Sequence, residues 1–195
     1  GVTLQVEEGL ELSLRGRIDR VDFAEEDGSL YVKVIDYKSG STKLDLGKVY
    51  YGLQLQLVLY LEAAMAMAAK RNPNRKLIPA GIYYYNMKDP IVSGFDMTKE
   101  EIEAKQQKEL RMNGLTSTEK ASLLLIDAEG GNVVSGLEYK KDGSLSSRAL
   151  VANADQMHEL GHFARKKALD LARDIYGGKI DAYPYEYKKM NPCEY

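Results

Sequence analysis

The sequence predicts an α/β fold in which a central mixed β-sheet is flanked by helices. Three observations support this prediction: two β-rich segments near the N-terminus, a long apolar helical segment followed by another strand, and a long amphipathic segment near the C-terminus. The 195 residues, of which 44% are hydrophobic and 29% charged, are typical of a single globular domain. We therefore expect residues 1–195 to form one domain, with an irregular insertion at about 88–150.

The first expected element is a β-hairpin. Residues 10–24 alternate between apolar and polar side chains, and residues 30–38 are rich in β-branched and aromatic side chains. The acidic and small residues at 25–29 predict a turn between them. The two segments are therefore expected to pair as antiparallel strands.

A core helix and a buried strand are expected next. Residues 49–70 have helical length and are apolar on almost every side, which predicts a helix packed in the core. The helix is expected to end before the helix-breaking residues at 72–74. Residues 77–87 (LIPAGIYYYNM) predict a strand that is buried over much of its surface.

The rest of the chain is expected to contain less regular segments and then a long helix. Residues 98–111 predict a charged helix, and residues 114–117 (GLTS) a turn. An apolar run at 122–127 precedes a glycine-rich patch at 130–136. Apolar residues at three- and four-residue spacing predict an amphipathic helix over about 154–176.

Composition excludes several classes of function. No apolar run approaches the roughly 20 residues that span a membrane, and the N-terminus lacks the features of a signal peptide. The net charge of −2 argues against a nucleic-acid binder that relies on bulk positive charge, although a local basic groove is compatible with it. The single cysteine, Cys193, suits a reducing compartment, so a cytoplasmic protein is expected. The absence of a starting methionine favours a piece of a longer protein.

Asp36 and Lys38 are the first candidate functional residues. One residue separates them in VIDYKSG, so on a strand both side chains lie on the same face, where the strand ends. Asp19, in GRIDRVD, lies on the predicted partner strand, and the hairpin can bring both aspartates to one face. Two carboxylates, with a main-chain carbonyl and waters, suit Mg²⁺, which with a nearby lysine serves phosphodiester hydrolysis. The simpler interpretation of Asp36 and Lys38 is a surface charge pair.

Gln56 and Tyr60 form the second candidate pair. They are four residues apart in QLVLY, hence on one face of the predicted helix. Their polar ends need partners once they are buried. Two satisfied polar groups in the core are the simpler interpretation of this pair taken alone.

Three motifs, in their order and spacing, closely resemble the RecB-type nuclease domains of the PD-(D/E)XK superfamily: GRIDRVD, VIDYKSG and QLVLY. Three further segments resemble, more narrowly, nuclease domains of the AddAB family of bacterial helicase–nucleases: RMNGLTST, GSLSSRAL and the C-terminal GGKIDAYPYEYKKMNPCEY. The resemblance covers nearly the whole chain. It implies a restriction-endonuclease-like fold and DNA-strand hydrolysis in a complex that resects double-strand breaks, together with an AddA-like partner subunit.

The resemblance also assigns roles to individual residues. It implies that Asp19, Asp36 and the carbonyl of Tyr37 bind Mg²⁺ or Mn²⁺, and that Lys38 is the catalytic lysine. Gln56 and Tyr60 would support the site or contact the DNA backbone. The alternative from another class of function is a non-catalytic scaffold or DNA-end-binding module of the same complex. This alternative predicts the loss of Asp19, Asp36 or Lys38.

The resemblance further implies a 4Fe–4S cluster in the full-length parent protein. Cys193 would be the first cysteine of a C-terminal run that joins one cysteine far upstream. Because such a cluster takes four thiolates, it is not expected on residues 1–195 alone. A helix before Gly1, carrying a His or Glu near the metal, is also expected in the parent.

HELGH at 158–162 matches the H-E-x-x-H signature of zinc proteases and requires a separate interpretation. His158 and His162 would bind zinc and Glu159 would activate water, but a third ligand is required. These are the only histidines of the chain, and Glu186 is the most plausible downstream carboxylate. The apolar stripe already explains this helix, so zinc proteolysis remains a remote alternative. The basic run at 165–167 is interpreted as a solvated helix face, with a DNA-backbone contact as its alternative.

Overall fold

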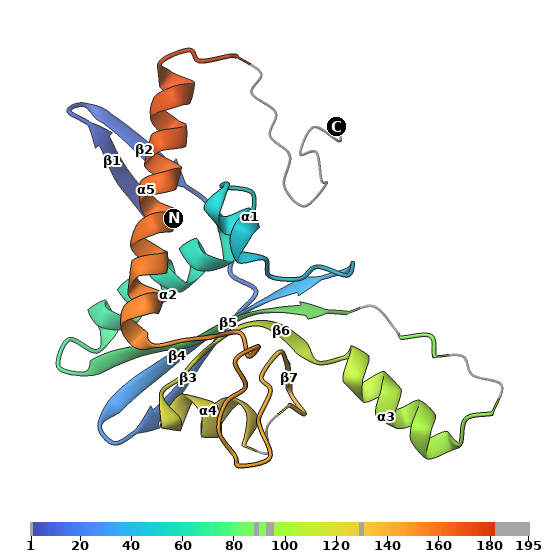
Figure 1. Cartoon of the computed structure of the whole chain (residues 1–195). Helices are drawn as coiled ribbons and strands as arrows, with labels where there is room; N and C mark the ends of the chain where they lie inside the picture. Colours follow the sequence, from blue (N-terminus) through green and yellow to red (C-terminus); the bar gives the residue numbers. More distant parts are fainter. Residues whose placement is uncertain (1, 88–89, 93–95, 129–130, 182–195) are drawn as a thin grey trace.

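The computed structural model describes residues 2–87, 90–92, 96–128 and 131–181. Its centre is a six-stranded mixed sheet in the order β3-β4-β5-β6-β7, with β8 paired to β6 (Figure 1). The strands of this sheet are β3 (Arg20–Glu26), β4 (Ser29–Lys38), β5 (Lys76–Asn86), β6 (Met112–Ser117), β7 (Val134–Ser135) and β8 (Val151–Ala152). The expected α/β fold with a central mixed sheet flanked by helices is therefore confirmed.

Helices cover both faces of the sheet. The helices of the described residues are α1 (Leu46–Tyr50), α2 (Gln56–Arg71), α3 (Lys99–Glu109), α4 (Lys120–Asp127) and α5 (Ala154–Tyr176). Residues of α2 and α5 form one apolar cluster with Val32 and Val34 of β4, whereas α4 packs with Tyr31 and Ile35 on the other face. The central strands are thus buried on both sides, which explains their continuous apolar sequence.

The predicted hairpin is confirmed as β3 and β4. These strands pair antiparallel from Arg20↔Ile35 to Glu26↔Ser29. Asp27 and Gly28 form the two-residue loop with φ angles of 48° and 73°, the left-handed conformations that such a tight hairpin turn requires.

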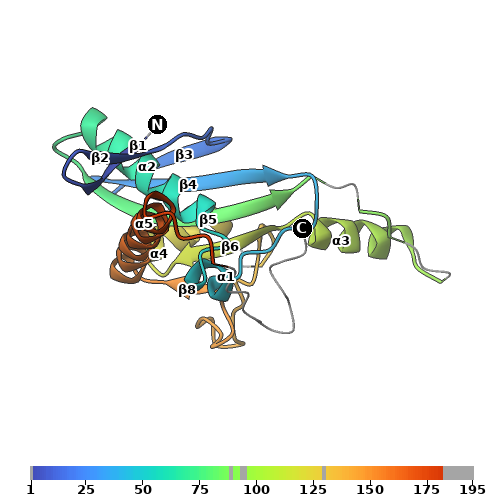
Figure 2. The same ribbon diagram turned by 90° about the horizontal axis from the view of Figure 1, so that it is seen from above.

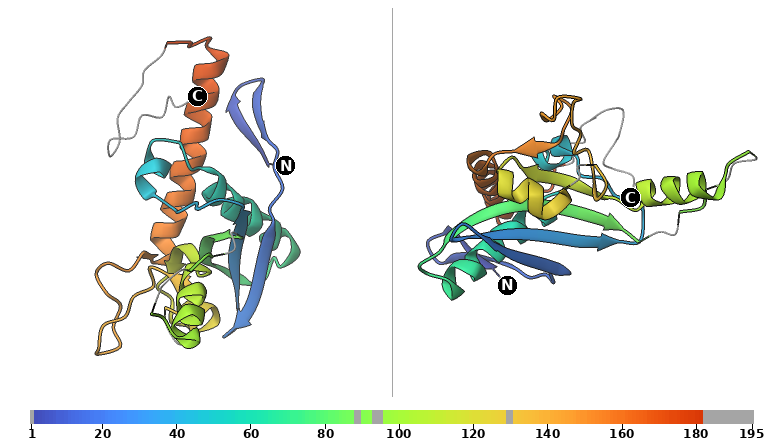
Figure 3. Two further views of the ribbon diagram at one scale, coloured as in Figure 1. Left: turned by 90° about the vertical axis from the view of Figure 1, so that its right-hand side faces the viewer. Right: turned by 90° about the horizontal axis from the view of Figure 1, so that it is seen from below.

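The expected single strand over 10–24 is wrong at its centre. Residues 10–14 form β2 (Leu10–Leu14), which pairs with β1 (Val2–Glu7) in a separate two-stranded sheet, while β3 begins only at Arg20. The apolar alternation stops at residues 15–17 (Arg-Gly-Arg), and this segment crosses from one sheet to the other. The small hairpin lies beside the C-terminal half of α5, where Arg173 donates to the carbonyl of Val6 (Figure 3, left).

The unit β4–α2–β5 places the ends of two strands at the same edge. β4 and β5 are parallel, as expected for strands joined by a crossover helix, and the predicted strand at 77–87 is confirmed. The single helix expected over 49–70 is instead two helices, α1 and α2, with residues 51–55 between them. The break occurs where Gly52 adopts φ = 86°, a conformation that a helix does not use.

The middle of the chain is more regular than its sequence indicates. The helix predicted at 98–111 is confirmed as α3, with a capping box between Thr98 and Glu101. α3 has no buried residue and projects beyond the sheet (Figure 2). The turn expected at 114–117 is wrong, because these residues form part of β6, and the apolar run forms α4. β7 lies within the glycine-rich patch.

Gly114 of β6 gives a prediction about stability. It lies opposite Tyr83 in the β5–β6 pair, and a Cβ at this position would meet main-chain atoms of Ile82 and Tyr83. Main-chain atoms cannot move aside as a flexible side chain can, so we expect Gly114→Ala to lower the free energy of unfolding by about 3 kcal/mol. Chemical denaturation measures this difference. Gly40→Ala is the matched control, since a Cβ at Gly40 meets nothing within 4 Å; equal losses in both variants would contradict the prediction.

The long helix predicted at 154–176 is confirmed as α5. Asn153 caps it in a reciprocal capping box with Gln156, and the small residues Ala164, Ala168 and Ala172 are buried on its inner side. No helix within the described residues is long and apolar enough to cross a membrane.

Candidate active site

The candidate residues Asp36 and Lys38 lie at the carboxyl end of β4. Residues 32 and 34 of this strand face α2, and the two-residue alternation continues to Asp36 and Lys38. Asp19 immediately precedes β3, and its Oδ2 accepts the backbone N–H of Tyr37 at 2.9 Å. The three candidate charged residues are therefore brought to one edge of the sheet, although Asp19 is in the segment before the strand and not within it.

Asp36 is a buried carboxylate whose Oδ2 pairs with a lysine but accepts no hydrogen bond from a described residue. Only 3% of the residue is exposed, and the Nζ of Lys38 lies 2.6 Å from its Oδ2 as an ion pair. The geometry of that contact is not that of a hydrogen bond, so Oδ2 is buried without a hydrogen-bond partner among the described residues. Such an oxygen is costly to bury unless a cation or donor compensates it.

Lys38 is held on its other side by the candidate pair on α2. Its Nζ donates to Oε1 of Gln56 at 3.1 Å, and Nε2 of Gln56 donates to the hydroxyl of Tyr60 at 3.0 Å. The Nζ also lies 5.4 Å from the centre of the Tyr84 ring. Burial, with a smaller contribution from Asp36, raises the pKa of Tyr84 to about 12, so this phenol stays neutral.

Two asparagines that the sequence does not single out hold the loop after Lys38. Asn86 exchanges two hydrogen bonds with the backbone of Thr42, at 3.0 and 3.1 Å. Asn113 donates to the carbonyl of Thr42 and accepts the N–H of Leu44, both at 2.9 Å. The available signal is an asparagine near one terminus of each neighbouring strand, at the last residue of β5 and the second of β6, but the sequence predicts a turn and not a strand at 114–117.

The donors at this edge fit a hard divalent cation. Asp19 and Asp36 supply carboxylate oxygens, and the buried Oδ2 of Asp36, which pairs with Lys38 at 2.6 Å, accepts no hydrogen bond from a described residue. Among the residues that the structure describes, no group of three or more His, Cys, Asp or Glu side chains is positioned for a metal. A cation here would therefore need main-chain oxygen, such as the carbonyl of Tyr37, and water in addition to the two aspartates.

The histidines of HELGH are on the surface of α5. His158, Glu159 and His162 are exposed, and Nδ1 of His162 lies 3.9 Å from Oε1 of Glu159. Glu159 thus lies beside a histidine on the same helix. Glu186 and Cys193 fall outside the described residues, and so the structure does not bear on the third zinc ligand or on the iron–sulfur prediction.

The site combines a buried Asp-x-Lys pair at the end of a strand, a second aspartate beside the neighbouring strand and a Gln-Tyr pair on a supporting helix. In an α/β fold this combination defines the class of nuclease that the sequence predicts. The chain belongs to the PD-(D/E)XK nuclease superfamily, whose family description matches residues 1–195. Enzymes of this superfamily generally use divalent metal ions. The fold class and the family resemblance expected from the motifs are thereby confirmed.

Several similar proteins carry the name of the same subunit of one kind of enzyme, an ATP-dependent helicase/deoxyribonuclease. The chain is 44% identical to this subunit from Lachnoclostridium phytofermentans over 94% of its length. It is 37% identical to the proteins of the same name from Clostridium kluyveri and Caldanaerobacter subterraneus, over its whole length. In each comparison the chain spans 17% of the relative, so it corresponds to one part of a much longer subunit.

The link between Gln56 and Tyr60 gives a prediction about turnover. We expect Tyr60→Phe to lower kcat roughly five- to tenfold with little change in KM, because Gln56 loses the acceptor that orients its amide toward Lys38. Steady-state cleavage of linear DNA by the full-length protein measures both constants. The double variant Tyr60→Phe/Gln56→Ala should cost little more than Gln56→Ala alone.

The matched control is Tyr50→Phe, because Tyr50 is exposed and stacks on Phe163 through its ring. A rise in KM with unchanged kcat in Tyr60→Phe would mean that the hydroxyl binds DNA directly and does not position the lysine.

Proposed function

We propose that this chain is the metal-dependent DNA exonuclease domain of an AddAB/RecBCD-like helicase–nuclease. The observation that carries the proposal is the buried Asp36, whose Oδ2 has no hydrogen bond from a described residue, beside Lys38. The superfamily and the names of the relatives support hydrolysis of DNA by this site. Residues 1–195 would form one nuclease domain of the larger subunit.

In the proposed site Asp19, Asp36 and the carbonyl of Tyr37 would hold Mg²⁺ or Mn²⁺, and such an ion would supply Lewis-acid chemistry for phosphodiester hydrolysis. Lys38 presents its ammonium group at the same point, where it offsets charge that develops on the phosphate. Gln56 fixes the position of that ammonium group, and Tyr60 fixes the orientation of Gln56. The N–H of Tyr37 holds Asp19 against β4, which keeps the second carboxylate at the strand end.

The setting of the domain follows from its relatives. Their name implies a helicase in the same assembly, so we propose that the substrate is DNA delivered by a motor and that an AddA-like subunit is the partner. Resection of double-strand breaks in the bacterial cytoplasm is the corresponding role. In the full-length protein Cys193 would contribute to a 4Fe–4S cluster, a proposal that iron analysis of the complete subunit can test.

A non-catalytic scaffold of the same complex is the second candidate. The presence of Asp19, Asp36 and Lys38 at one edge of the sheet argues for the catalytic alternative. The deciding experiment is cleavage of linear DNA by the complete subunit with its partner, with and without Mg²⁺, compared with an Asp36 variant. Equal cleavage by the wild type and the variant would assign the nuclease activity to the partner.

A further inference from the structure

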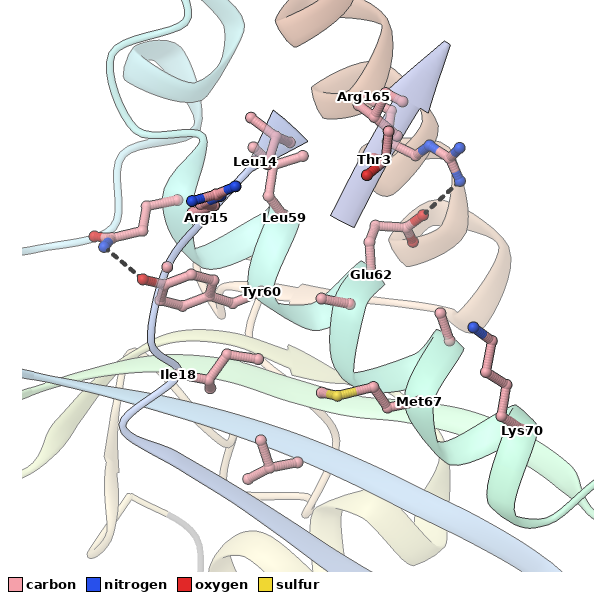
Figure 4. A pocket seen from close by; sticks show the side chains of 16 residues that line it. Thr3, Leu14, Arg15, Ile18, Leu59, Tyr60, Glu62, Met67, Lys70 and Arg165 are labelled. Atoms are coloured by element: carbon pink, nitrogen blue, oxygen red, sulfur yellow. Dashed lines mark hydrogen bonds and ion pairs between the residues drawn. The ribbon is translucent and has the colours of Figure 1, made fainter. Parts of the chain in front are cut away.

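A groove runs along one face of α2 (Figure 4), and its lining includes Gln56, which accepts a hydrogen bond from Lys38 of the candidate site. We call it the α2 groove; its walls are β1, the segment 14–18 and the face of α2 from Gln56 to Lys70, with Arg165 of α5 at its side. Its volume is about 730 Å³, within the range of sites that bind ligands. The part of this groove beyond Tyr60 has no role in the candidate site.

One end of the α2 groove lies at the candidate site. Gln56 and Tyr60 line that end, and Gln56 accepts a hydrogen bond from Lys38. From Gln56 to Lys70 the groove follows α2 for about 21 Å at about 1.5 Å per residue. A strand that occupied it could span roughly six nucleotides at the rise of about 3.4 Å found in stacked DNA. The groove is therefore connected to the chemistry and long enough for a polymeric substrate.

The floor of the α2 groove is apolar. Leu14, Ile18, Leu59 and Met67 contribute to it, and 47% of Met67 is exposed. Gly16 lies directly against the ring of Tyr60, where a Cβ would come to 3.0 Å from the hydroxyl oxygen. The floor thus offers flat apolar contact next to an aromatic ring, which is the surface that unpaired bases need for stacking and packing.

Positive charge is distributed along the α2 groove. Arg15 lies near Tyr60 at one end, Lys70 lies at the other end of the groove, and Arg165 extends from α5 at its side (Figure 4). Among the described residues of the lining, Glu62 is the only carboxylate, and it is paired with Arg165 at 4.0 Å. A chain with a net charge of −2 therefore places an excess of cations along this apolar surface. Charge of this sign matches a phosphate backbone.

We propose that the α2 groove binds the segment of single-stranded DNA adjacent to the phosphodiester that is cut. Arg15, Lys70 and Arg165 contact phosphates, and the bases lie on the floor around Met67. Duplex DNA does not fit these features, because its paired bases are stacked inside the helix and cannot reach an apolar floor. The proposal rests on the proposed nuclease function and extends it by naming the surface that guides the strand.

The test uses the complete subunit with its partner and a single-stranded oligonucleotide as substrate. We expect the double variant Arg15→Ala/Lys70→Ala to raise KM at least tenfold while kcat stays within twofold, because its changes lie outside the reacting centre. In the cleavage-deficient Asp36→Asn background, the same two changes should lower the salt dependence of binding by roughly 1.4 in the slope of log K against log salt, about 0.7 for each phosphate contact. An oligonucleotide with 4-thiothymidine near the cut should cross-link to α2.

The matched control is Lys141→Ala, in an exposed loop that packs with the α4 face of the sheet. This variant should leave KM and the salt slope unchanged. Met67→Glu should raise KM as well, because it puts a negative charge on the floor. An unchanged KM and salt slope in Arg15→Ala/Lys70→Ala overturns the proposal.

A second result also overturns it: a lowered Tm of the complete subunit in Met67→Glu with unchanged KM, which would show that another protein segment covers the floor. Failure of the nuclease function itself is recognised separately, because the wild-type complex would then not cleave DNA in an Asp36-dependent manner.

Discussion

Replacing Asp36 by Asn should abolish metal-dependent DNA cleavage, with a loss in kcat of about a thousandfold or more. The carboxylate is buried at the strand end, where its Oδ2 accepts no hydrogen bond from a described residue and pairs with the ammonium group of Lys38 at 2.6 Å. Asn keeps the shape of the side chain but removes the negative charge that a divalent ion requires. The measurement is release of nucleotides from linear DNA by the complete helicase–nuclease at saturating Mg²⁺.

A binding measurement separates loss of the metal from loss of the fold. Mg²⁺ that binds only the native state raises Tm, and this rise should be present in the wild type and absent in Asp36→Asn. Asp22→Asn is the matched control, because Asp22 lies on the same hairpin and pairs with Arg20 and Lys33 away from the site. The control should cleave within twofold of the wild type. Cleavage by Asp36→Asn at the wild-type rate would remove Asp36 from the reaction.

Replacing Lys38 by Met should lower kcat by about a hundred- to a thousandfold. The ammonium group is held between Asp36 and Gln56, at 2.6 and 3.1 Å, and is therefore fixed where the reacting phosphate would lie. Met preserves most of the side-chain volume and removes the charge. Lys38→Arg should not restore activity, because a planar guanidinium group cannot occupy the position of a compact ammonium group. Single-turnover cleavage measures the chemical step for each variant.

The two active-site variants should differ in their response to metal. Lys38→Met keeps both aspartates, so Mg²⁺ should still raise its Tm, unlike that of Asp36→Asn. Lys33→Met is the matched control on the same strand, since Lys33 pairs with Asp22 on the other side of the hairpin. A loss of activity in Lys33→Met as large as in Lys38→Met would show that general disturbance of β4, and not the position of Lys38, explains the effect.

Much of the candidate site was predictable because its residues are close in sequence. Asp36 and Lys38 are two residues apart on a strand, and Gln56 and Tyr60 are four apart on a helix, so local geometry alone places each pair on one face. What local geometry cannot give is the contact between the pairs. The hydrogen bond from Lys38 to Gln56 depends on how α2 packs across the sheet.

The remaining parts of the site depend on contacts between distant segments. Asn86 and Asn113 reach Thr42 across 44 and 71 residues of sequence, and no local pattern relates these positions. The incorrect prediction of a turn at 114–117 has the same origin, because a glycine such as Gly114 is typical of a turn in sequence. In the fold it is required by the close approach of β5. Glycine is suited both to a turn and to a close approach between strands, and only the position of the neighbouring strand shows which of the two applies.

The sequence by itself determined the elements that local patterns specify: the hairpin of β3 and β4, strand β5 and helix α5. The strands follow from β-rich runs beside turn residues, and the helix follows from apolar residues at three- and four-residue spacing. Only the tertiary structure decided that β2 leaves the main sheet, that a helix ends before Gln56, and that the α2 groove opens beside the site. The physical reason is that such features depend on packing between segments far apart in sequence, where burial outweighs local preference.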